Sequence, residues 1–150
     1  MSALDTFKFV EKKFENITDK AGSEYINHLM RVRDGIFDIY HFKSHDEKIT
    51  AICAAYLHDI FEDTDATEEE VKRECDVDDG VIEIVKLLTR DKNDTYMQYI
   101  EKLSTNKLAK IIKLADLKDN MDITRYSELK DEVFSLLKRY HKAYNFLINI

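Results

Sequence analysis

Apolar residues recur every three or four positions along almost the whole chain, which is the spacing of one face of an α-helix. Near the start this pattern is carried by Leu4, Phe7, Val10 and Phe14. Proline is absent and only three glycines occur, so the chain lacks the residues that form the tight turns of β-sheet proteins. We therefore predict an all-α fold, a compact bundle of about seven helices, in which residues 1–150 form one domain.

The same spacing predicts the helices that follow. One runs from about Glu24 towards Phe42, with Gly35 in its interior, where glycine weakens a helix. The next runs from Glu47 to about Phe61 and is apolar on nearly every side, as expected for a helix at the centre of a bundle. Further helices are expected over residues 68–75, 80–88, 95–104 and 107–117, and from residue 128 to the end.

The net charge of −7 argues against a nucleic-acid polymer as partner, because such binders need a basic surface. A small anionic substrate is compatible with this charge, since a bound metal ion and a few lysines create a local positive site. Cys53 and Cys75 are too few for a disulfide framework, so we expect a reducing, cytoplasmic setting. No signal peptide or membrane-spanning run is recognisable, and no pattern indicates an oligomeric state.

The motif HDIFED, residues 58–63, ends the predicted apolar helix. Ionisable side chains are costly to bury there unless a partner compensates their charge. At about 100° per helical residue, Glu62 falls on the face of His58 and Asp63 on the face of Asp59. Three carboxylates this close repel one another, and a divalent cation would hold them together. An imidazole with carboxylates suits Mn²⁺, Fe²⁺, Zn²⁺ or Mg²⁺, and the absence of thiolates argues against a purely structural zinc site.

Two further candidates lie far from this motif in the sequence. His28 lies in an otherwise apolar helix, where a single histidine is more often a core residue with a satisfied hydrogen bond. Asp116 ends another largely buried helix, where an acid opposes the helix dipole and favours a nearby cation. Together with His58 and Asp59 they give two histidines and two aspartates on three helices. That set leaves coordination positions for water and substrate.

These residues resemble a known family. His28, the pair His58–Asp59 and Asp116 reproduce the H…HD…D pattern of the HD superfamily of metal-dependent phosphohydrolases. GSEYINHLMRV and AAYLHDIFEDTDAT, together with LLTR, YMQYI and KLADLKDNM, are similar to segments of one branch, the alarmone hydrolases of the RelA/SpoT type and their small stand-alone relatives. The similarity is collinear over roughly residues 7 to 126. It implies that the helical bundle is an HD domain.

The resemblance implies hydrolysis of the 3′-diphosphate of the nucleotides ppGpp or pppGpp, with one divalent metal ion, usually Mn²⁺, as cofactor. The family's metal ligands correspond to His28, His58, Asp59 and Asp116. Its catalytic acidic pair corresponds to Glu62 and Asp63, which would orient and deprotonate a metal-bound water. Two residues near the nucleotide correspond to Lys20 and Asn120.

Three positions depart from the pattern of this branch. The Arg-Lys pair that usually precedes the glycine of the first segment reads Asp19-Lys20 here. The usual ADRLHNM reads ADLKDNM, with Leu117 and Asp119 in place of arginine and histidine. These changes leave the metal ligands intact and concern recognition of guanine and of the phosphate substituents.

Two alternatives to an alarmone hydrolase therefore stay open. The second hypothesis is an HD hydrolase of another phosphorylated small molecule, such as a nucleoside monophosphate or a cyclic nucleotide. The third is a catalytically silent nucleotide-binding regulator, which the intact ligand set and acidic pair disfavour. In either enzyme, the candidates to hold further phosphate groups are Lys20, Arg31, Arg33 and Arg90.

Overall fold

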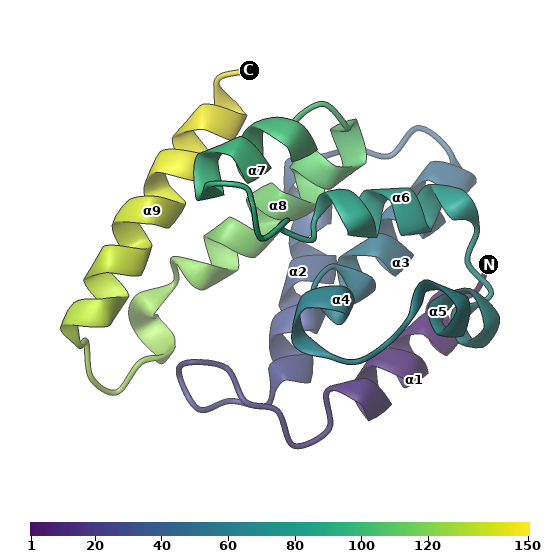
Figure 1. Ribbon diagram of the computed structural model, residues 1–150, viewed down its shortest axis with the longest axis horizontal. Helices are drawn as coiled ribbons and strands as arrows, with labels where there is room; N and C mark the ends of the chain where they lie inside the picture. Colours follow the sequence, from purple (N-terminus) through teal and green to yellow (C-terminus); the bar gives the residue numbers. More distant parts are fainter.

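Three helices, α2, α3 and α8, form the centre of the fold and are covered by the other helices (Figure 1). The computed structural model describes residues 1–150 and has no β-strand, which confirms the predicted all-α class. The elements are α1 (Ala3–Lys13), α2 (Tyr25–Ile39), α3 (His45–Leu57), α4 (Ile60–Asp63), α5 (Glu68–Cys75), α6 (Asp79–Leu87), α7 (Tyr96–Leu103), α8 (Lys107–Asn120), the 3₁₀ helix η1 (Ile123–Arg125) and α9 (Asp131–Ile148). No helix is both long enough and apolar enough to cross a membrane.

Helix α3 is the innermost element. Every residue from Ala51 to Leu57 is buried, because α1, α2 and α6 each pack against a different part of its surface. This arrangement explains why its sequence is apolar on nearly every side. The buried apolar side chains form one continuous cluster that includes residues as distant as Phe9 and Leu147.

Helix α2 continues through Gly35 without interruption. A Cβ atom at Gly35 would lie 3.3 Å from the Cβ of Ala115 on α8, which is closer than most carbon contacts. The missing side chain therefore allows α2 and α8 to approach each other closely. These two helices carry His28 and Asp116, so their separation sets the distance between two of the predicted metal ligands.

The helix predicted from Glu47 to about Phe61 is divided in two. Helix α3 ends at Leu57, and α4 begins at Ile60 as a separate helix of 4 residues. The Nδ1 atom of His58 is bonded to the carbonyl oxygen of Ala55 at 2.7 Å, the carbonyl that a continuing helix would pair with the N–H of residue 59. The assumption of one regular helix through residues 58–63 was therefore wrong, and the short α4 raises the number of α-helices to nine.

Helix α9 also differs from the prediction, since it begins at Asp131 and not at residue 128. It lies along one side of the molecule and packs on α7 and α8 (Figure 1). Only Ala143 and Leu147 of this helix are fully buried. Its first half is therefore available to line a cavity.

The close approach at Gly35 predicts the effect of a larger residue. We expect Gly35→Val to lower the free energy of unfolding by about 1–3 kcal/mol, because the added atoms push α2 away from Ala115. Urea denaturation with a chelator present measures this change. Asp38→Val is the matched control, since it puts the same β-branched residue at an exposed position of α2. Equal stability of Gly35→Val and Asp38→Val would contradict the interpretation.

Candidate metal centre

The structure brings the four predicted metal ligands together. His28 projects from α2, Asp116 projects from α8, and His58 and Asp59 occupy the break between α3 and α4. One ligand atom from each side chain lies within 4.8 Å of all the others. His28, His58 and Asp116 are each at most 3% exposed, and Asp59 is partly buried.

The nitrogen and oxygen atoms of this cluster face one another across a small space. The Nε2 atom of His28 lies 3.2 Å from Oδ1 of Asp116 and 3.7 Å from Oδ2 of Asp59. The Nε2 atom of His58 lies 3.0 Å from Oδ2 of Asp59 and 3.4 Å from Oδ1 of Asp116. Two imidazoles and two carboxylates in this arrangement are a donor set for a divalent metal ion.

The opposite ring nitrogen of each histidine is already occupied. The Nδ1 atom of His58 is bonded to the Ala55 carbonyl, which only an N–H can satisfy. The Nδ1 atom of His28 lies 2.6 Å from Oδ2 of Asp119. Each Nε2 atom is buried and has no hydrogen-bond partner. Buried polar atoms are rarely left unpaired, and a metal ion would satisfy both of these nitrogens, so the residues present fit a divalent metal site.

Neighbouring side chains fix the two carboxylates. The hydroxyl of Tyr25 donates to Oδ2 of Asp59 at 2.5 Å. Lys113 Nζ and Asn120 Nδ2 donate to Oδ2 and Oδ1 of Asp116, each at 2.8 Å. Burial by itself raises the pKa of Asp116, but Lys113 and the two imidazoles hold the pKa of this carboxyl well below its usual value. Asp116 is therefore ionised, as a metal ligand must be.

A cavity of about 540 Å³ opens beside this cluster. Its lining includes Glu62 and Asp63 on α4, Lys20 on the loop before α2, and Asn120 at the end of α8. The structure thus brings every predicted site residue to this cavity or to the buried cluster at its base. The amide nitrogen of Asn120 contacts Asp116, so this residue touches a predicted metal ligand as well as the cavity.

The residues of α4 carry the acidic pair. The backbone N–H of Arg90 donates to Oε1 of Glu62 at 2.5 Å, which ties α4 to the segment between α6 and α7. Partial burial, together with the carboxylates of Asp59 and Glu62, raises the pKa of Asp63 to about 6. A carboxylate with a pKa near neutrality can accept a proton and release it again at physiological pH.

The comparison with known families concerns the same region of the chain. The HD domain family matches residues 23–121, which contain all four cluster residues. The chain belongs to the HD domain family. The His58-Asp59 pair of this HD chain lies at the break between α3 and α4. There it meets His28 and Asp116.

Two relatives of this HD chain carry names that state an activity. A guanosine-3′,5′-bis(diphosphate) 3′-pyrophosphohydrolase of Haemophilus influenzae is 32% identical over an alignment of 110 residues that covers 67% of this chain and 15% of the relative. A guanosine-3′,5′-bis(diphosphate) 3′-pyrophosphohydrolase MESH1 of Danio rerio is 35% identical over an alignment of 133 residues that covers 81% of this chain and 69% of the relative. The chain thus spans less than a sixth of the bacterial relative and about two thirds of the zebrafish one.

A solved structure has the same fold. It is described as a metazoan orthologue of SpoT that hydrolyses ppGpp, and it superposes with a TM-score of 0.76. The match covers 97% of this chain and 84% of the other, with 23% sequence identity. At this identity the likeness establishes a shared fold.

Some residues of the HD cavity were not predicted from the sequence. Tyr25, Lys113 and Asp119 contact the cluster directly, and Arg139 and Tyr140 of α9 line the cavity. Lys113 and Asp119 could have been predicted from the sequence. They lie three residues before and three residues after Asp116, on neighbouring turns of α8. The residues of α9 could not, because only the packing of that helix on α7 and α8 places them there.

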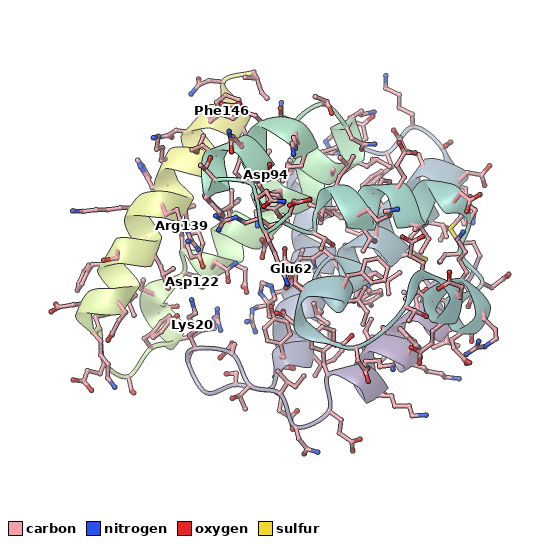
Figure 2. The ribbon with its side chains drawn as sticks, viewed as in Figure 1. Lys20, Glu62, Asp94, Asp122, Arg139 and Phe146 are labelled. Atoms are coloured by element: carbon pink, nitrogen blue, oxygen red, sulfur yellow. The ribbon has the colours of Figure 1, made fainter.

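The cations named as phosphate candidates divide into two groups. Arg31 pairs with Asp119, Arg33 pairs with Asp34, and Arg90 donates to the carbonyl oxygen of Asp94. Lys20 forms no ion pair, and neither does Arg139. Figure 2 shows both of these side chains on the α9 side of the molecule, where they line the cavity with Glu62. Like-charge repulsion from Arg139 adds to partial burial in lowering the pKa of Lys20.

The raised pKa of Asp63 predicts a pH-dependent stability. The folded carboxyl ionises near pH 6 and the unfolded one near 3.8, so the folded state binds more protons between these values and stability falls as the pH rises through them. We expect Asp63→Asn to raise the free energy of unfolding at pH 7.5 by about 1 kcal/mol, a figure reduced for solvent screening because this carboxylate is only partly buried.

Urea denaturation in the presence of a chelator at pH 7.5 and pH 3.5 measures this effect. Most of the gain should disappear at pH 3.5, where Asp63 is protonated in the folded state and mostly protonated in the unfolded one. Asp38→Asn, at an exposed position of α2, is the matched control. A loss of stability in Asp63→Asn at pH 7.5 would show that the carboxylate is not under repulsion.

Proposed function

We propose that this chain is a metal-dependent phosphohydrolase that removes the 3′-diphosphate of guanosine 3′,5′-bis(diphosphate) and its pentaphosphate analogue, with release of pyrophosphate. The observation that carries this proposal is the buried set of two histidines and two aspartates, with both Nε2 atoms unpaired, beside a cavity that contains an acidic pair and unpaired cations. The names of two relatives, each more than 30% identical, support the choice of substrate.

The proposed ligands of the metal ion are His28, His58, Asp59 and Asp116, and we propose Mn²⁺ as the ion. Nitrogen and carboxylate donors without thiolates suit this metal. A divalent ion held there supplies a water of lowered pKa and offsets negative charge on the diphosphate. Tyr25 and Lys113 each occupy one carboxylate oxygen of this set, which fixes the orientation of Asp59 and Asp116.

Glu62 and Asp63 are the proposed acid–base pair. One oxygen of Glu62 accepts the N–H of Arg90, so its carboxylate is held in place while the other oxygen stays free to orient a water. Asp63, with its pKa raised to about 6, is suited to take a proton from the attacking water and return it to the leaving group. Such proton transfer contributes typically ~10²–10⁴-fold to the rate.

The far side of the cavity is suited to the remainder of the nucleotide. Lys20 and Arg139 have no anionic partner in the protein and lie where a second phosphate group would reach them. Tyr126, Leu136 and Leu137 add an apolar wall against which a purine base can pack. The net charge of −7 makes these local cations more important for an anionic substrate, because the rest of the surface repels it.

A second candidate is an HD hydrolase of another phosphorylated nucleotide. One observation favours it: the carboxylate of Asp19 accepts hydrogen bonds from Arg125 and from two backbone N–H groups. Position 19 therefore offers neither a free cation nor a stacking surface to a guanine base. Nucleoside monophosphates and cyclic nucleotides belong in the same substrate panel for this reason.

The continuous buried core supports treating residues 1–150 as one domain, as predicted. Cys53 and Cys75 are free and buried, which supports a reducing, cytoplasmic setting.

The function is tested by pyrophosphate release. We expect metal-free protein to be inactive with ppGpp and to release pyrophosphate and GDP once Mn²⁺ is added. Pyrophosphate and inorganic phosphate are measured separately, because they distinguish cleavage at the 3′ oxygen from removal of a terminal phosphate. If folded, Mn²⁺-bound protein releases nothing from ppGpp but hydrolyses another nucleotide, that nucleotide replaces ppGpp as the proposed substrate. Absence of turnover on the whole panel would favour the regulator.

Two substitutions separate metal binding from proton transfer. Asp59→Ala should abolish Mn²⁺ binding and activity together, because it removes a charged ligand. Glu62→Gln should keep Mn²⁺ bound and slow turnover by ~10²-fold, since the amide oxygen still accepts the Arg90 N–H while the charge is lost. Isothermal titration and steady-state kinetics measure the two effects. Asp38→Ala and Glu83→Gln, at exposed positions, are the matched controls. Wild-type turnover by Asp59→Ala would refute the site.

A further inference from the structure

Asp119 contacts the back of the proposed metal ligand His28. Its Oδ2 atom lies 2.6 Å from Nδ1 of His28, on the side of the ring away from the cluster. Its Oδ1 atom accepts from Nε of Arg31 at 2.7 Å. The side chain of Asp119 is 8% exposed, so these contacts are largely shielded from water. Although burial by itself raises its pKa, the bonds to His28 and Arg31 lower the pKa of Asp119 to about 2.

Asp19 organises the loop before α2 in a comparable way. Its Oδ1 atom accepts the backbone N–H groups of Ala21 and Ser23 at 2.9 Å and 3.0 Å. Between them Gly22 has φ +87°, a conformation that favours glycine. The other oxygen, Oδ2, accepts from Nη1 of Arg125 at 2.7 Å and lies 3.8 Å from Nη2 of Arg31. The carboxylate of Asp19 therefore holds the loop that carries Lys20 together with backbone bonds, among them the Asp19 N–H to the Ser23 carbonyl at 2.8 Å.

Arg125 closes this network into a ring. Its Nη2 atom lies 3.3 Å from the carbonyl oxygen and 3.5 Å from Oδ2 of Asp119. Asp19, Arg125, Asp119 and Arg31 thus alternate in charge and sum to zero, and we call them the four-residue ring. It joins the loop before α2, α2 itself, the end of α8 and η1, and the loop lies beside that end of α8 in Figure 1.

The ring connects two positions at which this sequence departs from the pattern of its branch. Asp19 and Asp119 are 100 positions apart in the sequence, and each is one of the departures from the resembled pattern described above. In this chain both are carboxylates, and Arg125 touches both of them. The two departures therefore belong to one network.

We propose that Asp119 is a positioning residue for the metal centre, and that the rest of the ring holds Asp119 against His28. A carboxylate that accepts from one imidazole nitrogen fixes the tautomer and the ring orientation, so that the other nitrogen faces the metal with its lone pair. The same ring ties the Lys20 loop to this ligand. The inference rests on the metal site of the proposed function.

The affinity of metal-free protein for Mn²⁺ tests the proposal without any nucleotide. We expect Asp119→Ala to weaken binding by about 10–100-fold, the range found for such outer contacts. Asp119→Asn should weaken it less, because the amide oxygen still accepts from Nδ1 but carries no charge. Arg125→Gln, which leaves His28 and Asp119 in place, should weaken binding by a smaller factor than Asp119→Ala. Isothermal titration measures all three constants.

Matched controls use the same substitutions at exposed ion pairs. Asp79 pairs only with Lys72, and Arg73 pairs only with Glu74, both far from the cavity lining. Asp79→Asn and Arg73→Gln should therefore bind Mn²⁺ with wild-type affinity. Nitrogen-15 NMR of the histidine side chains adds a second readout on the same proteins. Loss of the bonded Nδ1–H signal of His28 is expected in Asp119→Ala and not in the controls.

The result would differ if Asp119 only stabilised the fold and did not position His28 for the metal ion. The substitutions Asp119→Asn and Arg125→Gln would then lower the melting temperature while leaving the Mn²⁺ dissociation constant of both unchanged, and that outcome overturns the proposal. The variants Asp119→Asn and Arg125→Gln distinguish the two roles even if Asp119→Ala does not fold. Wild-type protein that binds no Mn²⁺ overturns this inference together with the metal site. Tight Mn²⁺ binding that depends on Asp119, without turnover of ppGpp, refutes only the proposed substrate.

Discussion

Two imidazoles and two carboxylates meet inside the protein where α2, α8 and the break between α3 and α4 converge. Two negative charges in a site shielded from water repel each other, and each loses the hydration it has in the unfolded chain. The surrounding side chains compensate for this cost. Lys113, Asn120 and Tyr25 donate to the carboxylates, and each histidine is bonded through its outer nitrogen. The Nε2 atoms of His28 and His58, which face into the cluster, are left without a hydrogen-bond partner. They mark the place for a cation.

Three features of the helical framework bring these side chains together. Helix α3 is apolar on almost every side because it is enclosed by other helices, and it ends at the point where the His-Asp pair begins. Gly35 removes a side chain where α2 crosses Ala115, so that His28 and Asp116 come within reach of each other. The break after Leu57 turns α4 away from the axis of α3 and directs the acidic pair to the cavity.

The charges are also arranged unevenly around the cavity. Two of the cations that line the cavity are paired, Lys113 with Asp116 and Arg125 with Asp19 of the four-residue ring. Lys20, Arg90 and Arg139 line the cavity without an ion pair, and the Arg90 side chain donates to the backbone carbonyl of Asp94. A cavity with carboxylates and histidines at one end and free cations at the other suits a substrate with phosphate groups at two separate places. This division of charge links the proposed metal chemistry with the proposed nucleotide.

The sequence alone was sufficient for the fold class and for naming four residues whose side chains meet in the buried cluster. Helical periodicity without proline predicts an all-α bundle, because burial of one helix face is a local property of residues three and four apart. The ionisable motif at the end of an apolar helix, together with the likeness to HD proteins, identified His28, His58, Asp59 and Asp116. The helix break at residues 58–59 was missed, because it depends on a side-chain bond that periodicity does not reveal.

Only the tertiary structure decided which cations are free, which carboxylate supports His28, and which helix closes the cavity. Asp19 and Arg125 are 106 positions apart, and Arg139 reaches the cavity only because α9 packs on α7 and α8. Such contacts depend on how helices are placed in space, and the spacing of residues within one helix carries no information about that placement. The sequence thus determined which helices form and which chemical groups they carry. The packing determined which of those groups meet, because ion pairs between distant segments form only once the helices are in contact.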